Sequence, residues 1–371
     1  MAEISYRAAD DCALHATVIG EGRALVLMHA GGPDHKSMLP LAERLAGRRM
    51  VILPDLRGYG RSVCRDPARH TWAQYTKDVI WLLDHIGLPH AVLAGAGLGS
   101  TITLRTAAAH PDRVGAAVLI GVEDIEDDEA KEAEIRFLDA FAARVAADGI
   151  EAGWEPIRAD FPPVVGAMVR DAIPRSDPAS IVAAAAIGHD RSFRSISELA
   201  RITTPTPIFP GTDPRHPTAL AEEAADTLPN GQLAMVPIGN DLQTAEDLAC
   251  AVAPAIVEFL RSPVRAGGRS SDWSRPGSAE VTVDEHEPGP PCELVPRRPG
   301  RVRTQASAGH AGAAAPRRVA AAPDHQPGRR RAVVFQVRNK GLAVLTGCGH
   351  AGIVNLVRHT QNSPMSFDGR W

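Results

Sequence analysis

The sequence predicts an α/β protein with a doubly wound, mostly parallel sheet, and three observations support this fold class. Continuous apolar runs at residues 24–28 and 51–54 are typical of strands buried on both faces. Helical patterns alternate with these runs, which favours parallel strands joined by crossover helices. A third apolar run, residues 92–94, enters a glycine cluster and continues into a helical stretch. Such a sharp turn needs small residues and a positive φ at its tip.

The remaining elements follow from local patterns. Residues 4–8 and 12–19 alternate in polarity and predict an opening hairpin. Trp72–His85 has apolar residues at helical spacing and stops before Gly87, so a helix is expected there. Further strands are expected at residues 92–94, 116–120, 207–209 and 233–236, and a closing helix at residues 244–260.

The glycine cluster carries the main resemblance to a known family. Gly95-Ala96-Gly97-Leu98-Gly99 resembles the nucleophile elbow of the α/β-hydrolase fold, Gly-x-Ser-x-Gly. In that family a serine, cysteine or aspartate stands at the tip. Gly97 occupies the nucleophile position in this chain and has no side chain. The resemblance therefore implies the α/β-hydrolase fold without its usual nucleophile.

A second stretch of small residues resembles the family's oxyanion loop. It reads His29-Ala30-Gly31-Gly32-Pro33-Asp34 and follows the strand at residues 24–28. The resemblance implies that the backbone N–H groups of Ala30 and Leu98 stabilise a negative oxygen, worth about 2.7–4 kcal/mol per donor. His29, Ala30, Gly31 and Leu98 are thus the expected oxyanion and binding residues. A plain strand-to-helix turn is the alternative.

A third matching loop has a structural role. Asp55-Leu56-Arg57-Gly58-Tyr59-Gly60-Arg61-Ser62 closely resembles the family's Asp-x-Arg-Gly-x-Gly-x-Ser loop. Asp55 and Arg57 are expected to fix the loop by hydrogen bonds, while the glycines permit the turn. We expect this loop to contribute little to catalysis.

Two triad positions lie in the last third of the expected core. The resemblance implies that Asp213, after the strand at 207–209, is the triad acid, and that Asn240 stands where the family has its histidine. An amide side chain does not titrate near neutrality, so Asn240 cannot act as the base. Losing serine or base costs on the order of 10⁶ in turnover in such enzymes. Ordinary serine hydrolysis is therefore not expected.

Other residues could replace the missing pair. Ser100 lies three positions past the tip of the elbow, although packing is the simpler reading of it. Three histidines could reach a pocket from loops, namely His35, His189 and His216. A relocated nucleophile and base, with Ser100 and His216 as candidates, would make the protein an active hydrolase.

Three functional hypotheses follow. The first is a protein that acts on a small carbonyl or ester-like molecule by non-serine chemistry, such as a lyase, isomerase or water-mediated hydrolase step, in which Asp213 and Asn240 orient water or substrate. The second is a non-catalytic pseudoenzyme that binds a ligand or partner. The third is the relocated hydrolase.

The domain organisation is expected to be a hydrolase core at residues 1–122 and 200–261 with a helical cap at 123–199. The acidic run at 123–129 is interpreted as a solvated helix start rather than a metal site, because it lacks calcium-loop spacing. Pocket-lining candidates in the cap are Trp154, Phe161, Met168 and Phe193.

Beyond Ser262 the composition changes. Residues 262–331 are rich in Arg, Pro, Gly and Ala and are expected to form a disordered linker. Residues 332–371 form a fragment in which 333–337 and 342–346 predict two strands. The segment 346–355 resembles part of the metallo-β-lactamase-fold hydrolases, in which the histidine corresponding to His350 binds metal. The rest of that family's ligand cluster is missing, so neither metal binding nor activity is expected there.

Charge, cysteine content and apolar runs limit the kinds of partner and compartment that we expect for this protein. The net charge of −4 divides into +8 over residues 262–371 and −12 over residues 1–261, and an acidic body does not favour a nucleic-acid partner. The five scattered cysteines predict neither a disulfide framework nor a zinc knuckle, which fits a reducing cytoplasm. No run reaches the roughly 18 apolar residues of a membrane span. A small-molecule ligand and no cofactor are expected, and the oligomeric state stays open.

Overall fold

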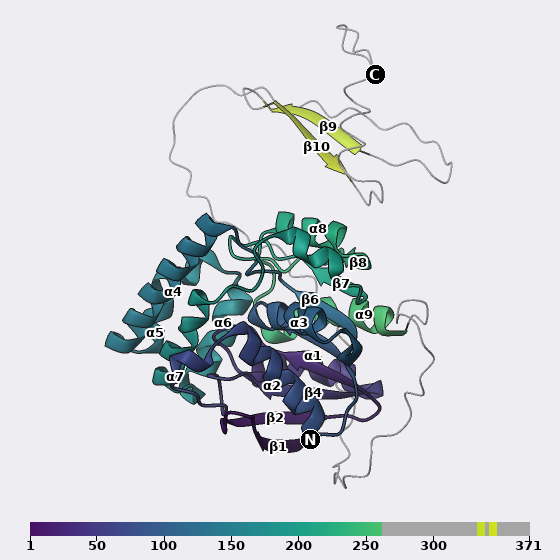
Figure 1. Cartoon of the computed structure of the whole chain (residues 1–371). Helices are drawn as coiled ribbons and strands as arrows, with labels where there is room; N and C mark the ends of the chain where they lie inside the picture. The colour runs from purple at the N-terminus through teal and green to yellow at the C-terminus, as the bar shows by residue number, and fades with distance from the viewer. Residues whose placement is uncertain (262–331, 338–340, 347–371) are drawn as a thin grey trace, which may run out of the picture. The chain divides into compact units, whose positions relative to one another are not determined.

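The computed structural model describes residues 1–261 and the backbone of two short strands at 332–337 and 341–346. The long part contains one sheet of eight strands (Figure 1). Its strands are β1 (Ala2–Arg7), β2 (Ala13–Ile19), β3 (Arg23–Met28), β4 (Arg49–Asp55), β5 (Ala91–Ala96), β6 (Val114–Ile120), β7 (Thr206–Phe209) and β8 (Gly231–Leu233). Its α-helices are α1 (Leu39–Leu45), α2 (Trp72–His85), α3 (Leu98–Ala109), α4 (Asp128–Asp148), α5 (Ile150–Trp154), α6 (Pro163–Ala172), α7 (Pro178–Ala184), α8 (Thr218–Thr227) and α9 (Ala245–Arg261).

The sheet is mostly parallel, as the alternation of strands and helices predicts. The strand order is β1-β2-β4-β3-β5-β6-β7-β8. The hairpin of β1 and β2 is antiparallel and joins β4 antiparallel, whereas every pair from β4–β3 to β7–β8 is parallel. Since β3, β5, β6 and β7 are neighbours, the loops that follow them meet at one edge of the sheet, where open α/β sheets bind their ligands.

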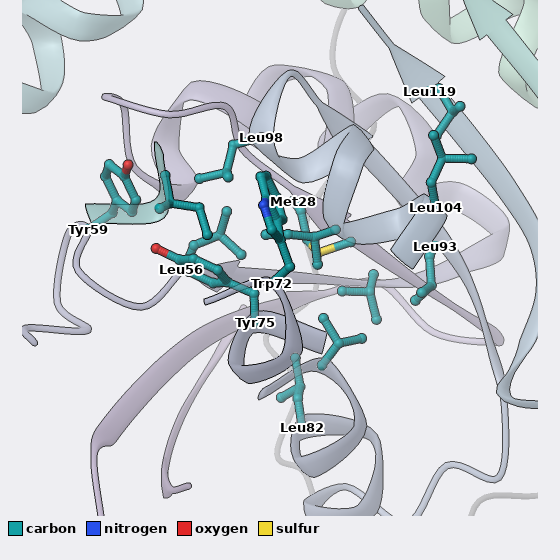
Figure 2. Packing of buried hydrophobic residues seen from close by; sticks show 14 of the residues in the cluster. Met28, Leu56, Tyr59, Trp72, Tyr75, Leu82, Leu93, Leu98, Leu104 and Leu119 are labelled. Carbon is teal, nitrogen blue, oxygen red and sulfur yellow. The ribbon is translucent and has the colours of Figure 1, made fainter. Parts of the chain in front are cut away.

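Both faces of the sheet are buried. Along β3, Val26 and Met28 belong to one apolar cluster, and Leu25 and Leu27 belong to another. Successive side chains of a strand point to opposite faces, so a continuous apolar run implies cover on both sides. Helices α2 and α3 pack on the first cluster and α1 and α9 on the second. Figure 2 shows the first cluster, with side chains of α2 and α3 packed against those of the strands.

The region between β6 and β7, where the sequence predicts a helical cap, contains α4 to α7. These helices gather on one side of the sheet in Figure 1. The N-cap of α4 is Asp127, whose side chain accepts from the N–H of Ala130. Their inward side chains are apolar and aromatic, and the loops after the parallel strands lie against them.

The last strand of the sheet differs from its prediction. Residues 233–236 are apolar, yet β8 covers only Gly231–Leu233. Leu233 is 36% exposed and Met235 is 92% exposed, so this apolar run is not a buried strand. Pairing resumes as an isolated bridge between Gly211 and Ile238. At a sheet edge, apolar composition is a poor guide to burial.

Near the C-terminus, β9 (Ala332–Val337) and β10 (Gly341–Thr346) pair as an antiparallel hairpin, close to the two predicted strands. The expectations of a disordered linker at 262–331 and of no metal binding at His350 concern residues that lie outside the described ones.

Candidate active site

The elbow between β5 and α3 has the geometry that its glycines predict. Gly97 adopts φ 48° and ψ −115°, a conformation that side-chain-bearing residues rarely adopt. A Cβ on Gly95 would lie 2.1 Å from the carbonyl carbon of Gly99. A Cβ on Gly99 would lie 2.8 Å from the carbonyl oxygens of Met28 and His29. The close packing of β5, α3 and the end of β3 therefore requires glycine at both positions.

An imidazole and a carboxylate face the tip of this elbow. A Cβ built on Gly97 would lie 3.3 Å from Nε2 of His216 and 3.0 Å from Oε1 of Glu123. The Cβ of Ala30 would be 3.4 Å away. His216 follows β7 and Glu123 follows β6, so neighbouring strand ends bring both residues to Gly97 at the tip of the elbow.

His216 forms a pair with Asp213. Its Nδ1 lies 3.0 Å from each carboxylate oxygen of Asp213. The backbone N–H groups of Arg215 and His216 also donate to Oδ1 of Asp213, each at 3.0 Å. Because a carboxylate only accepts, Nδ1 carries the ring proton, and the basic Nε2 faces Gly97.

The protonation of this pair follows from its surroundings. Burial lowers the pKa of His216, but the charges of Glu123 and Asp213 outweigh burial and raise this pKa above its ordinary value. Burial raises the pKa of Asp213, but the hydrogen bond and charge of His216 outweigh it and lower this pKa. Oε2 of Glu123 lies 3.5 Å from Nε2 of His216. The imidazole is therefore a stronger base than a histidine in water.

Arg215 organises the acidic groups beside the pair. Its Nε donates to Oε2 of Glu123 at 2.5 Å, and its two terminal nitrogens donate to Glu134 at 2.8 and 2.7 Å. Burial lowers the pKa of Arg215, but the carboxylates of Glu123 and Glu134 raise it well above its usual value. Glu123 is thereby held in place against the elbow.

Asp124 is strained and buried at the same point. Its φ is 61°, and Oδ2 accepts from the hydroxyl of Thr101 at 3.0 Å. Burial and the charge of Glu123 raise the pKa of Asp124 well above its usual value. Strained backbone of this kind concentrates at functional sites.

The interpretation of residues 123–129 as a solvated run is therefore wrong for its first residues. Glu123 is 6% exposed, and the side chain of Asp124 is 8% exposed. Only the later part of the run, from the N-cap Asp127, starts helix α4. The buried acids depend on Arg215, about 90 positions away, and no local pattern reveals that pairing.

Two backbone donors flank the elbow. Among the hydrogen bonds of the described residues, none uses the N–H of Ala30 or Leu98. Both residues line the cavity together with Gly31. The His29 side chain is fully buried; its Nδ1 lies 2.7 Å from the carbonyl oxygen of Ala30, and its Nε2 accepts from the N–H of Leu56 at 3.0 Å. His29 therefore positions the loop and does not line the cavity.

A cavity of about 150 Å³ opens over the elbow, a volume comparable to one that accepts a benzene ring. An aromatic wall runs from His216 to Phe161 (6.5 Å between ring centres), Trp154 (5.9 Å) and Phe141 (5.4 Å). Most other lining side chains are apolar, and the polar ones gather near Gly97. The lining contains no serine, threonine or cysteine within residues 1–261.

Ser100 and Asn240 are not among the residues that line the cavity. The Ser100 hydroxyl donates to the carbonyl oxygen of Gly95 at 2.7 Å and accepts from the N–H of Ile120 at 3.1 Å. It bridges β5 and β6 and is fully buried. Asn240 is exposed and is not among the lining residues. The structure thus brings Asp213 to Gly97 with His216, and not with Asn240.

Of the remaining candidate residues, some line the cavity and others do not. His35 bonds to Asp55 through Nδ1 at 2.7 Å and supports the loop after β4. His189 pairs with Asp139 at 2.8 Å on the surface. Trp154, Phe161 and Met168 line the cavity as expected. Phe193 does not, because it packs in the core under the guanidinium of Arg105, 5.3 Å from the ring centre.

The fold and this site define a protein with the α/β-hydrolase fold: a mostly parallel eight-stranded sheet, an elbow after β5 and a pocket at the strand ends. Residues 23–161, under half of the chain, match the family model described as the alpha/beta hydrolase fold. The sequence resembles a 2-hydroxy-6-oxo-6-phenylhexa-2,4-dienoate hydrolase of Comamonas testosteroni (32% identity over 129 residues; 32% of this chain and 43% of the relative). It also resembles an epoxide hydrolase of Caballeronia sordidicola (37% over 121 residues; 31% and 36%). These matches span under half the length of the relatives.

Solved structures support the same fold over a longer stretch. An esterase from Thermogutta terrifontis aligns with a TM-score of 0.60 and 26% identity, covering 70% of this chain and 98% of the esterase. An enol-lactonase from Burkholderia xenovorans LB400 aligns with a TM-score of 0.58 and 22% identity, covering 70% and 100%. The second likeness concerns the fold alone.

Two further findings apply to the described part of the chain. Its helices include none with the length and apolarity that crossing a membrane requires. Its His, Cys, Asp and Glu side chains form no group of three with a metal-binding arrangement.

Proposed function

We propose that this protein is an enzyme that attacks a small, largely apolar carbonyl or ester-like molecule without a serine nucleophile, using His216 as general base and water as attacking group. The observation that carries the proposal is the Asp213–His216 pair, whose Nε2 would lie 3.3 Å from a Cβ on Gly97. A base that is paired with a carboxylate and faces an elbow without a side chain suits activation of a water molecule.

The proposed reaction gives the base and the two backbone donors separate tasks. A water molecule beside Gly97 gives a proton to Nε2 of His216 while its oxygen bonds to the carbonyl carbon. The carbonyl oxygen becomes negative and accepts from the N–H groups of Ala30 and Leu98, which have no other acceptor among the described residues. The imidazolium returns the proton to the leaving group, and the carbon–leaving-group bond breaks.

Asp213 and Glu123 support the base in different ways. Asp213 accepts from Nδ1 and stabilises the imidazolium that forms. Glu123 raises the pKa of His216, and its Oε1 faces the proposed water position. Arg215 keeps the Glu123 carboxylate oriented.

A panel of aryl esters, lactones and thioesters tests the proposal. Wild-type turnover should fall at least about 10²-fold in His216→Gln, because general-base catalysis contributes 10²- to 10⁴-fold. His189→Gln is the matched control, since it removes a histidine that also pairs with an aspartate but lies on the surface. Equal activity in His216→Gln and wild type would refute the role of His216.

The pseudoenzyme hypothesis makes a different prediction for the same panel. If the cavity only binds, compounds would raise the melting temperature, no product would form with any of them, and His216→Gln would leave the thermal shift intact. The relocated-hydrolase hypothesis instead requires that Ser100→Ala abolish turnover. The two hydrogen bonds of the Ser100 hydroxyl to β5 and β6 argue against that outcome.

A further inference from the structure

The cavity has a second polar feature that the proposed reaction does not use. Nε1 of Trp72 and Nε1 of Trp154 are buried and have no hydrogen-bond partner, and both tryptophans line the cavity. Trp72 is 2% exposed. A buried N–H without an acceptor costs about 1–3 kcal/mol, so such groups call for an explanation.

Trp72 is held firmly where it stands. It is the first residue of α2, and its backbone N–H donates to Oδ2 of Asp190 at 2.8 Å. Its ring centre lies 6.5 Å from that of Tyr75. Figure 2 shows the indole among Leu98, Met28 and Tyr75, which offer its nitrogen no side-chain acceptor. The N–H therefore has no acceptor among the described residues, while the residue that carries it lines the cavity, so a molecule in the cavity is the acceptor that we assign to it.

Trp154 supplies a second unused donor in the lining of the cavity. Its ring lies against the loop after β3, where a Cβ on Gly32 would be 2.5 Å from the indole. Rings of Phe141 and Phe161 pack edge-on against it. One unused indole donor thus comes from the core helix α2 and one from α5.

We infer that the substrate is a neutral, apolar or aromatic molecule with a second hydrogen-bond acceptor, a ketone, ester, ether or amide oxygen, to which the Trp72 indole N–H donates. This assignment rests on the proposed function for the reacting carbonyl and adds the recognition of the far group. A molecule with only one acceptor would leave either Trp72 or the donors at Ala30 and Leu98 unsatisfied.

The charge of the reacting end explains why the acceptor is neutral rather than a carboxylate. Four carboxylates, Glu123, Asp124, Glu134 and Asp213, surround two cationic groups, Arg215 and His216. Carboxylates exceed cations even when His216 is protonated and Asp124 is neutral. An anion entering the same small cavity would be repelled, since charges are poorly screened in a partly desolvated pocket.

Three probes of one shape test the inference by calorimetric binding to the His216→Gln variant, so that turnover does not interfere. Methyl 4-acetylbenzoate carries a second acceptor, methyl 4-isopropenylbenzoate replaces it with an isosteric apolar group, and monomethyl terephthalate replaces it with a carboxylate. The acetyl probe should bind about fivefold more tightly than the isopropenyl probe, the effect of one neutral hydrogen bond. The carboxylate probe should bind weakest.

Trp72→Phe keeps a ring and removes the N–H, so it should abolish the difference in affinity between the acetyl and isopropenyl probes. Trp81→Phe is the matched control, because Trp81 is exposed, and it should preserve this difference. If Trp72→Phe does not fold, ¹⁵N-resolved indole resonances of the full chain give the answer: the acetyl probe should shift the Trp72 signal downfield and the isopropenyl probe should not. Equal affinities with no indole shift, or tightest binding of the carboxylate, would overturn the inference. A failed turnover panel with intact probe selectivity would refute only the proposed reaction.

Discussion

At the scale of single residues, the site depends on which side chains face Gly97. The imidazole of His216 and the carboxylate of Glu123 lie within contact distance of a Cβ there, and Asp213 fixes the ring. Neither Ser100 nor Asn240 takes part in these contacts. Two residue-scale predictions follow from this geometry.

The first concerns protonation. Glu123 raises the pKa of His216, so Glu123→Gln should lower it. The neutral imidazole is the base and predominates above the pKa, so turnover should fall as pH drops through it, and this acid limb should move to lower pH in Glu123→Gln. Histidine NMR titration, with the His216 signal assigned by its loss in His216→Gln, measures the same shift without requiring activity. An unchanged titration would contradict the role of Glu123.

The second concerns the missing nucleophile. Gly97→Ser places a hydroxyl beside the existing Asp213–His216 pair, so it should produce a burst of p-nitrophenol from p-nitrophenyl acetate, with an acetylated chain visible by mass spectrometry. The backbone strain costs roughly 1–3 kcal/mol, because Gly97 has a positive φ. Adding Asn240→His should change little, since position 240 is exposed and outside the cavity. A burst only in the double variant would instead assign the base to position 240.

At the scale of elements, close packing at the elbow holds the site together. Gly95→Ala would put a Cβ within 2.1 Å of the Gly99 backbone, where α3 and β5 cannot separate without moving the core. Chemical denaturation should show a loss of about 3 kcal/mol or more. Gly47→Ala is the matched control, because its Cβ would meet nothing within 4 Å. Equal losses in both variants would indicate a backbone effect unrelated to packing.

A buried cation joins three elements away from the elbow. Arg57, in the loop after β4, bonds to Asp78 of α2 at 2.7 and 2.8 Å and to Asp10 of the β1–β2 turn at 2.8 and 3.1 Å. Arg57→Met should lower the free energy of unfolding by about 3–5 kcal/mol, because it leaves the buried carboxylate of Asp78 without its cation. Arg7→Met, which breaks an exposed pair with Asp11, should change it by about 0–1 kcal/mol in the same denaturation experiment.

At the scale of the whole molecule, one part of the chain contains every group assigned to the site. The described lining residues fall between Ala30 and Leu248. Helix α9 completes the second apolar cluster through Val252 and Ile256 and ends at Arg261. A chain ending at Arg261 should therefore keep the melting temperature and the affinity for methyl 4-acetylbenzoate of the full chain. A loss of either would show that residues beyond 261 support the fold or the cavity.

Sequence alone determined the fold and the backbone of the site. Buried strands, elbow glycines and the small-residue loop at Ala30 are local signals, because each depends on the conformation and packing of a few consecutive residues. Tertiary structure decided which side chains meet at Gly97. The sequence pointed to Asn240 and to a solvated acidic run, whereas the structure places His216 beside Gly97 and Glu123 in the lining of the cavity. Contacts between the ends of different strands depend on strand order and loop direction. Local sequence patterns specify neither the strand order nor the direction of the loops.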